Sequence, residues 1–376
     1  MINKKIKVVP NGVNTNQFKP LSKEEQRRWM ENYFRVEFGS DLNIINVGRL
    51  SREKGIQYLI KSLKYLSPAT KLFLVGDGPE KKGLEKIVEK LELEKQVIFM
   101  GKIAHEKLPE VLNAMDVFVL PAVSMEGFSN SMLEAMACGL PVITTPIGAG
   151  AEVIKEEIGA VVEPKKPKKL ADAIIKCSNL DGKRIREYVE ENFSFNVVAD
   201  LVYDLYSQLC GKEVERICYC SLFAPPYQLS GAGMQVHELS KALSKLCDVS
   251  VSVISTRIEG EKEELMDGVR YYRVKYIPGE ARSRFVYSLL GTLKGLSLDK
   301  FDVVDGRNWE GGLISVSVSK RKGSKSVMSF RGEGAVEGPW VKNRINKWIL
   351  RRVDLATATD RRTAEKVDRV LGGVRS

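Results

Sequence analysis

The sequence predicts an α/β fold of two domains, each built on a doubly wound parallel sheet. Predicted strands and helices alternate along almost the whole chain, which is the pattern of repeated strand–helix–strand units. At 376 residues the chain is long enough for two domains with separate hydrophobic cores. The composition, 43% hydrophobic and 28% charged, is typical of a soluble globular protein.

Composition argues against several classes of protein. No apolar run approaches the roughly 20 residues of a membrane span, and no N-terminal signal pattern is present, so we expect a cytoplasmic protein. The six cysteines form no CxxC pairs, which indicates reduced core residues rather than a disulfide frame or zinc site. With only two histidines, a histidine-rich metal site is excluded.

Apolar patterning and turn residues place the elements. In the first half, strands are predicted at 6–9, 42–47, 71–75, 97–101, 117–120 and 142–145, and helices at 55–66, from 129–131 onward, and at 168–177, 183–192 and 195–210. In the second half, strands are predicted at 215–221, 249–254, 269–274, 301–304, 326–330 and 355–359, and helices at 234–246, 284–296, 309–319, 339–352 and 361–371.

The most informative stretch lies between the predicted strand 117–120 and the helix that follows it. Glu126 falls in the connecting loop and Glu134 on the first turns of the helix, so both lie near the carboxyl edge of the sheet, where ligands bind in open α/β folds. Carboxylates there can bind sugar or ribose hydroxyls, and the helix start favours phosphate. The structural alternative is a capping box formed by Ser131 and Glu134.

The wider passage resembles a known family. Glu126, seven residues, Glu134 and then Ala-Met-Ala-Cys-Gly-Leu-Pro-Val resemble the donor-site signature of retaining family 4 glycosyltransferases of the GT-B fold. Residues 48–55, Gly-Arg-Leu-Ser-Arg-Glu-Lys-Gly, resemble the segment with which that family clamps phosphate. The resemblance covers essentially the whole chain once its halves are reordered, and it is strongest across 44–152.

The resemblance implies roles for the residues of the donor side. Arg49 and Lys54 would stabilise the departing diphosphate, although by itself their segment also fits a solvated charged turn. Glu126 would orient the donor sugar and Glu134 the ribose. Gly127, Phe128, Ser129 and Asn130, which follow Glu126, are further donor-binding candidates, and Ile103 lies in a segment that resembles the place where the family's backbone reads the base. We take His105 as a surface residue.

The two halves stand in the reverse of the family's order. Residues 8–20 resemble the crossover that lies near the middle of family members, and the chain stops where the family's first domain would run into it. We therefore expect a circular permutation, with a donor-binding domain at 19–212 and an acceptor-side domain at 213–376 whose sheet is completed by residues 1–18. Alternatively, the strand 6–9 pairs with another copy, or two half-enzymes have been fused.

The acceptor side departs from the family at its histidines. The glycine loop that includes Gly233 resembles the family's first loop, where the backbone approaches donor phosphate or acceptor. Arg331 stands where the family often has a histidine that points at the transferred sugar, and Asp305-Gly306-Arg307-Asn308 replaces another histidine-bearing segment. Arginine stays protonated and cannot act as a general base, but it can stabilise phosphate or a carboxylated acceptor.

The net charge of +11 is concentrated near the C-terminus, with fifteen basic and six acidic residues in 320–376. This field suits nucleotide phosphates or an acidic lipid surface, and no nucleic-acid motif is present. Residues 340–353 predict a basic amphipathic helix containing Trp340. It either contacts the inner face of an anionic membrane or packs its apolar side onto the sheet.

Together these observations predict a GT-B protein whose two Rossmann-like domains face a cleft. The function that the resemblance implies is transfer of a sugar, with retention, from a nucleotide diphosphate sugar to a hydroxyl of a carbohydrate or lipid-linked acceptor, without metal or other cofactor. Two alternatives remain: a GT-B sugar-nucleotide epimerase, and a non-catalytic scaffold that binds sugar nucleotides.

Overall fold

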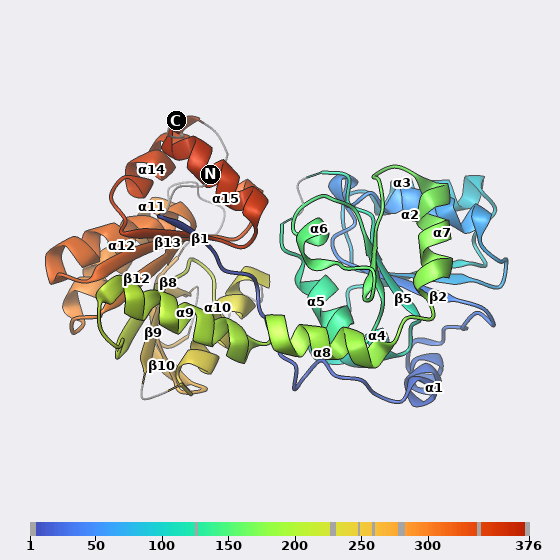
Figure 1. Ribbon diagram of the computed structural model, residues 1–376, viewed down its shortest axis with the longest axis horizontal. Coiled ribbons are helices and arrows are strands. Elements are labelled where there is room, and N and C mark those ends of the chain that lie inside the picture. Colours follow the sequence, from blue (N-terminus) through green and yellow to red (C-terminus); the bar gives the residue numbers. More distant parts are fainter. Residues whose placement is uncertain are drawn as a thin grey trace. The chain divides into compact units, whose positions relative to one another are not determined.

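The computed structural model describes residues 5–124, 127–225, 231–246, 249–257, 260–276, 283–336 and 340–372. The chain divides into two compact units, labelled by element in Figure 1. The first unit is Val13–Ser194, and the second unit is Met1–Gly12 together with Phe195–Ser376. Among the described residues, no helix has the length and apolar character needed to cross a bilayer.

The first unit contains a six-stranded, fully parallel sheet in the order β4-β3-β2-β5-β6-β7. Its strands are β2 Asn43–Val47, β3 Lys71–Val75, β4 Val97–Gly101, β5 Val117–Leu120, β6 Val142–Thr144 and β7 Gly159–Val161. Its helices are α1 Lys23–Phe34, α2 Ile56–Ser62, α3 Lys81–Lys90, α4 Leu108–Asn113, α5 Asn130–Ala137, α6 Gly150–Val153, α7 Pro167–Cys177 and α8 Gly182–Phe193.

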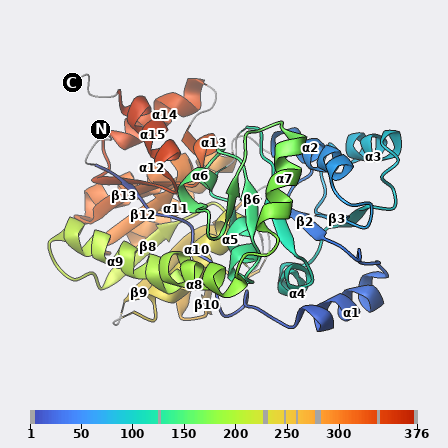
Figure 2. The same ribbon diagram turned by 45° about the vertical axis from the view of Figure 1, so that its right-hand side comes forward.

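Helices cover both faces of this sheet (Figure 2). The helices α4, α5 and α8 share one hydrophobic cluster with Ile45 of β2, and α2, α3 and α7 share the other with its neighbour Ile44. Successive side chains of a strand point to opposite faces, so a strand that is apolar at both positions is buried from both sides. The doubly wound parallel fold expected from the sequence is confirmed here.

The second unit contains an eight-stranded sheet in the order β1-β14-β13-β12-β8-β9-β11-β10. Its strands are β1 Ile6–Val8, β8 Arg216–Cys220, β9 Ser250–Arg257, β10 Glu263–Met266, β11 Val269–Lys275, β12 Val303–Arg307, β13 Lys325–Phe330 and β14 Leu355–Ala358. Its helices are α9 Phe195–Cys210, α10 Gly231–Leu243, α11 Ser283–Ser297, α12 Asn308–Lys322, α13 Glu333–Val336, α14 Trp340–Leu350 and α15 Arg361–Leu371. The helices α9 and α10 share one cluster, and α11 and α12 share another.

One edge of this sheet is antiparallel, which corrects the expectation of a parallel sheet throughout. β10 pairs antiparallel with β11 through a turn in which Asp267 (φ 52°) and Gly268 (φ 82°) adopt left-handed conformations. A two-residue Asp-Gly turn produces a hairpin, because a parallel neighbour needs a long crossover. His237 of α10 contacts Asp267 (3.1 Å) and the hydroxyl of Tyr271 (2.7 Å), so its role is structural.

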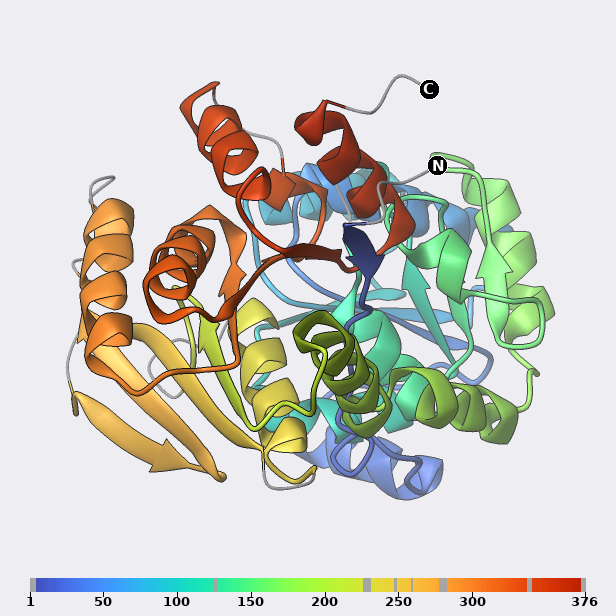
Figure 3. The same ribbon diagram turned by 60° about the vertical axis from the view of Figure 1, so that its left-hand side comes forward.

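The N-terminal strand lies at the other edge of the second sheet. β1 pairs in parallel with β14 of the same chain, with Ile6 opposite Ala356, and its dark-blue arrow lies beside the red strand β14 in Figure 3. The backbone of Gly12 is then held to α10, since the amide of Gln235 accepts from its N–H (3.0 Å) and donates to its carbonyl (2.7 Å). The chain enters the first unit directly after this anchor.

The chain returns to the second unit at Phe195, so the whole of α9 lies with the second sheet. Val198, Val202 and Tyr206 of this helix belong to the core that α10 shares with β8. The sequence predicts domain limits at 19 and 212, whereas the structure divides into its two compact units at 12/13 and 194/195.

Asp302, just before β12, holds the start of β12 to that of β8. Its Oδ2 accepts from the backbone N–H groups of Glu215 (3.0 Å) and Arg216 (2.9 Å), and its Oδ1 lies 2.7 Å from Nζ of Lys212. Burial acts to raise the pKa of this carboxyl, but the hydrogen bonds from Lys212 and the two backbone groups outweigh it and hold the pKa below the ordinary 3.8. Such a group stabilises the fold above its ordinary pKa, and this stabilisation is lost as the pH falls through the folded pKa.

We therefore expect Asp302→Asn to lower the free energy of unfolding near neutral pH by about 1–3 kcal/mol, since a charged hydrogen-bond acceptor is lost. The difference from the native chain should shrink as the pH falls from 3.8 through the lowered pKa of the folded carboxyl, because the carboxyl is protonated first in the unfolded chain and then in the native chain. Urea unfolding at several pH values measures this. The control Asp299→Asn removes a carboxylate that is 84% exposed beside Arg216 and should change stability by less than about 1 kcal/mol. A deficit that stays constant into strong acid would contradict the prediction.

Candidate functional site

The carboxyl edge of the first sheet is where its glycine-rich loops meet. The N–H of Gly48, after β2, donates to Val75 O (2.9 Å), and that of Gly76, after β3, donates to Gly101 O (2.7 Å). Gly76 has φ 129°, and a Cβ at this position would lie 1.9 Å from the carbonyl oxygen of Gly48. Only glycine permits this approach, so the loops after β2, β3 and β4 form one connected backbone surface.

The loop after β2 carries the two predicted diphosphate ligands. Residues 52–54 form a short 3-10 turn that ends at Gly55, which has φ 66°, and α2 follows. The hydroxyl of Ser51 donates to Glu53 Oε1 (2.6 Å); this bond is the main reason why the pKa of Glu53 is lowered, with smaller contributions from the charges of Arg49 and Lys54. Arg49 is exposed and Lys54 half-buried, so the loop presents cationic side chains at the edge of the sheet.

The start of α5 is fixed differently from the capping box considered above. Ser129 is the N-cap, and its hydroxyl accepts from the N–H of Met132 (3.4 Å). Ser131 lies inside the helix and donates to Val47 O at the end of β2 (3.1 Å), which ties α5 to the loop that carries Arg49. Glu134 therefore does not cap the helix.

The side chain of Glu134 pairs with His105, which the sequence predicts to be a surface residue. His105 Nε2 lies 2.9 Å from Glu134 Oε1, and the His105 ring packs edge-on against Phe18 at 5.2 Å. Glu134 is 12% exposed and His105 39% exposed, so the pair is open to solvent on the histidine side. His105 is therefore more than an ordinary surface residue. It follows β4, so it lies at the same edge of the sheet as the loop after β2.

The remaining donor-side candidates occupy the same edge. Ile103 is half-buried and packs against the core, as does Phe128, whose ring lies 5.8 Å from that of Phe193. The carbonyl of Gly127 accepts from the N–H of Ala149 (3.4 Å), which joins this loop to the one after β6. Asn130 begins α5. Glu126 lies outside the described residues.

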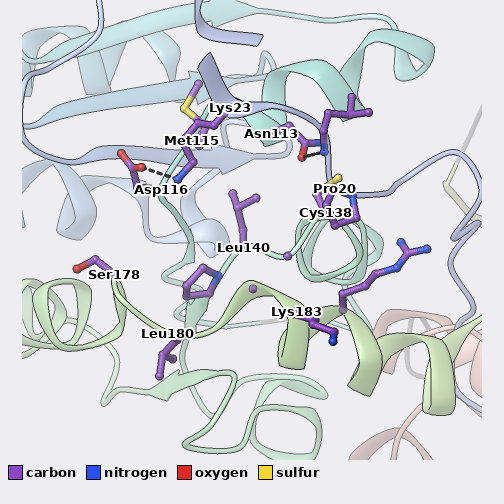
Figure 4. A pocket seen from close by; sticks show the side chains of 15 residues that line it. Pro20, Lys23, Asn113, Met115, Asp116, Cys138, Leu140, Ser178, Leu180 and Lys183 are labelled. Carbon is purple, nitrogen blue, oxygen red and sulfur yellow. Dashed lines mark hydrogen bonds and ion pairs between the residues drawn. The ribbon is translucent and has the colours of Figure 1, made fainter. Parts of the chain in front are cut away.

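A pocket of about 470 Å³ lies at the opposite, amino edge of the first sheet (Figure 4). Asp116, before β5, is the carboxylate among its described lining residues, but it is paired with Lys23 (2.9 Å) and Arg27 (2.8 Å) and accepts from the N–H of Asn43 (2.8 Å). Burial raises the pKa of the Cys138 thiol, which favours its protonated form. None of the predicted site residues lines this pocket, and its carboxylate is already neutralised.

The second unit has a small pocket at the carboxyl edge of its sheet. It encloses about 100 Å³ and is lined by Ser221, Leu222, Phe223, Arg284, Arg307, Asn308, Glu310 and Arg331. Arg331 thus lies near the carboxyl ends of β8, β12 and β13. Gly233 is buried in the first turn of α10 and does not line the pocket. Within the part of the chain that the structure describes, no group of three or more His, Cys, Asp or Glu side chains could hold a metal ion.

Comparison with protein families identifies both units. Residues 32–192 match the family of glycosyl transferases group 1, and residues 230–376 match the glycosyl transferase 4-like domain. Each unit thus matches a glycosyltransferase domain family. The two α/β units are those of the GT-B fold, and the group 1 domain precedes the 4-like domain, as a circular permutation requires.

The chain is 33% identical over 210 residues to an uncharacterized glycosyltransferase of Methanocaldococcus jannaschii, a match that covers 54% of the chain and 50% of the relative. It is 26% identical over 213 residues to a phosphatidylinositol N-acetylglucosaminyltransferase GPI3 subunit of Saccharomyces cerevisiae (54% and 46% covered). The chain spans about half the length of the curated relatives it matches. Among solved structures, sucrose-phosphate synthase from Thermosynechococcus elongatus is 31% identical, with a TM-score of 0.48 and 55% and 53% of the two chains covered.

The packing of the glycine loops leads to a stability test. Gly76→Ala would drive a Cβ into the backbone oxygen of Gly48, and we expect it to lower the free energy of unfolding by about 3 kcal/mol or more. Gly101→Ala is the matched control, because Gly101 also has a positive φ (66°) but nothing within 4 Å of the added Cβ; it should cost only the conformational strain of about 1–2 kcal/mol. Urea unfolding of both variants decides the matter, and equal losses would contradict the close approach.

Proposed function

We propose that this protein transfers a sugar, with retention of configuration, from a nucleotide diphosphate sugar to a hydroxyl of an acceptor. The observation that carries the proposal is the tie between α5 and β2: Ser131 binds Val47 O and so places Glu134 at the edge from which the loop of Arg49 and Lys54 emerges. A carboxylate and two cations at one edge of an open α/β sheet suit a ribose and a diphosphate. The match of each unit to a glycosyltransferase domain family supports the same assignment.

In the proposed reaction, Arg49 and Lys54 stabilise the negative charge that grows on the departing diphosphate. Glu134 accepts hydrogen bonds from the ribose hydroxyls, and His105 positions its carboxylate by holding Oε1 at 2.9 Å. The backbone beside Ile103 contacts the base, and the loop of Gly127, Phe128, Ser129 and Asn130 contacts the donor. Glu126 orients the sugar hydroxyls. None of these steps calls for a metal ion or another cofactor.

The acceptor side is proposed to lie in the second unit, near Gly233 and Arg331. A carbohydrate or lipid-linked hydroxyl compound is the acceptor class we favour. The yeast relative is named as a subunit of a phosphatidylinositol N-acetylglucosaminyltransferase, which supports a lipid-linked acceptor. A GT-B epimerase or a non-catalytic sugar-nucleotide scaffold would share the donor site but would not transfer sugar.

A peripheral contact with an anionic membrane is a second proposal, carried by α14. Ile349 and Leu350 of this helix are buried, so part of its apolar side packs onto the unit as the structural interpretation required. Trp340 (69% exposed) and Trp348 (44%) remain on the surface, stacked with the guanidinium groups of Arg344 (4.6 Å) and Arg352 (4.1 Å). Exposed tryptophan beside arginine suits the headgroup region of an anionic bilayer.

The donor proposal is tested by the thermal stability of the whole chain with UDP, GDP, ADP and their sugars. One nucleotide class at about 100 times its Kd should stabilise the protein by about 2.7 kcal/mol. Glu134→Ala should reduce this stabilisation, while Glu187→Ala, a half-exposed glutamate of α8 paired with Lys183 (3.8 Å), should leave it unchanged. Stabilisation by no nucleotide would contradict the donor site. Conversion of the donor without acceptor would favour the epimerase, and binding without turnover the scaffold.

For the membrane proposal, the protein should sediment with vesicles that contain phosphatidylserine at low salt, and less with neutral phosphatidylcholine vesicles. Trp340→Ala with Trp348→Ala should reduce the bound fraction several-fold, because the two exposed rings are lost. Tyr65→Ala removes an equally exposed aromatic ring (53%) from the first unit and is the control. Failure to bind anionic vesicles at low salt, or equal loss in the control, argues against the contact.

A further inference from the structure

Arg307 is a buried cation whose charge is only weakly compensated. Its side chain is 5% exposed at the end of β12, and its Nε and Nη1 have no hydrogen-bond partner. The carboxylate of Asp305 is 3.9 Å from Nη2, beyond hydrogen-bond distance. Burying a charged group without hydrogen bonds is costly, and unsatisfied buried polar atoms are rare in native proteins. Two donor atoms of this guanidinium therefore lack a hydrogen-bond partner in the protein, and its Cζ lies 5.0 Å from the centre of the Tyr219 ring.

The nearby Asp305 is already satisfied by other groups. Its Oδ2 accepts from the hydroxyl of Tyr206 in α9 (2.7 Å), and both its oxygens lie 2.8 Å from the hydroxyl of Ser329 in β13. The Ser329 hydroxyl also lies 2.7 Å from that of Thr357 in β14. These contacts hold the carboxylate within the sheet layer, while Arg307 lines the pocket at the sheet edge.

Arg331 lines the same pocket from the next strand. Its Nη1 donates to Asn11 Oδ1 (3.1 Å), but its buried Nε has no partner. Arg284 is also in the lining and is committed to Glu310 (2.8 Å), a carboxylate whose pKa is raised by burial despite this contact. The described lining residues thus include three arginines and one carboxylate, and two of the arginines have buried donor atoms without a hydrogen-bond partner.

We propose that this pocket binds a phosphate or carboxylate group carried by the substrate of the second unit, which by the proposed function is the acceptor. Planar guanidinium groups match the oxygens of phosphate and carboxylate and form charged hydrogen bonds with them. The first N–H groups of the 15-residue helix α12, which starts in the pocket at Asn308, favour the same charge. At about 100 Å³ the pocket holds one small anionic group and not a nucleotide.

Only the assignment of the anion to the acceptor depends on the proposed function. The anion subsite itself is inferred from the surroundings of Arg307 and Arg331. The anion has two possible sources, an acceptor phosphate or carboxylate and a carboxylate on the transferred sugar. The proposal assigns it to the acceptor, because the whole lining belongs to the second unit.

The test is isothermal titration of the full chain with glycerol 3-phosphate and with glucuronate, against glycerol and glucose as neutral counterparts. The native chain should bind at least one anionic probe and neither neutral one. Arg331→Gln should weaken that binding about tenfold or more, as expected for a lost charged hydrogen bond. Arg270→Gln, an exposed arginine of β11, should not change it. Arg307→Gln should behave like Arg331→Gln; where it fails to fold, the half-buried Arg331 carries the test.

Further titrations separate this proposal from the proposed function. UDP should bind Arg331→Gln as it binds the native chain, while Glu134→Ala should lose UDP and keep the anionic probe. If the native chain binds none of UDP, GDP and ADP but still binds the anionic probe, the donor site is refuted and the anion subsite stands. If Arg331→Gln weakens UDP-glucuronate but not UDP-glucose or the free probes, the anion belongs to the transferred sugar and the acceptor assignment is overturned. Absence of anionic-probe binding by the native chain, or equal weakening in Arg270→Gln, overturns the subsite itself.

Discussion

Parallel pairing of the strands is the constraint on which both units depend. Parallel neighbours require a crossover connection, usually a helix, so the parallel strands of one sheet end at the same edge and their loops converge there. In the first unit, this brings together the loop of Arg49 and Lys54, the start of α5 and His105. In the second, it places Arg307 and Arg331 at the ends of adjacent strands. Candidate functional residues that are far apart in the sequence become neighbours because the loops that carry them all lie at the carboxyl edge of the sheet.

The charged side chains at the carboxyl edges of the two sheets are stabilised in different ways. At the first, the cations lie on a partly exposed loop, and Glu134 is paired with His105, so water and a partner share the solvation of the charges. At the second, Arg307 is buried, and the nearest carboxylate is occupied by the hydroxyls of Tyr206 and Ser329. A buried guanidinium with unsatisfied donors is unfavourable in the folded chain. In our proposal, an anionic ligand provides the missing hydrogen-bond acceptors.

The reversed order of the two units depends on a short piece of chain. Three residues, Ile6–Val8, add a parallel strand beside β14, and the amide of Gln235 then fixes Gly12 before the chain enters the first unit. Phe195 packs over Gly12, where a Cβ would come within 2.5 Å of the Phe195 ring. The chain therefore leaves the second unit at Gly12 and returns to it at Phe195, and these two residues are in contact within the second unit.

The sequence by itself determined the fold class, because alternating strand and helix patterns and apolar runs such as Val117–Leu120 are local properties. It also located Arg49, Lys54 and Glu134, whose spacing resembles a family signature, and it marked the departure at Arg331. The tertiary structure decided what depends on contacts between distant segments. It replaced the capping box by the Ser131–Val47 bond and joined His105 to Glu134. It divided the apolar residues of α14 between core and surface. It showed that Asp305 accepts hydrogen bonds from hydroxyls of two other elements, α9 and β13, while Nε and Nη1 of Arg307 have no hydrogen-bond partner. These outcomes follow from hydrogen-bond and burial requirements across the sheet, to which residue order along the chain gives no direct access.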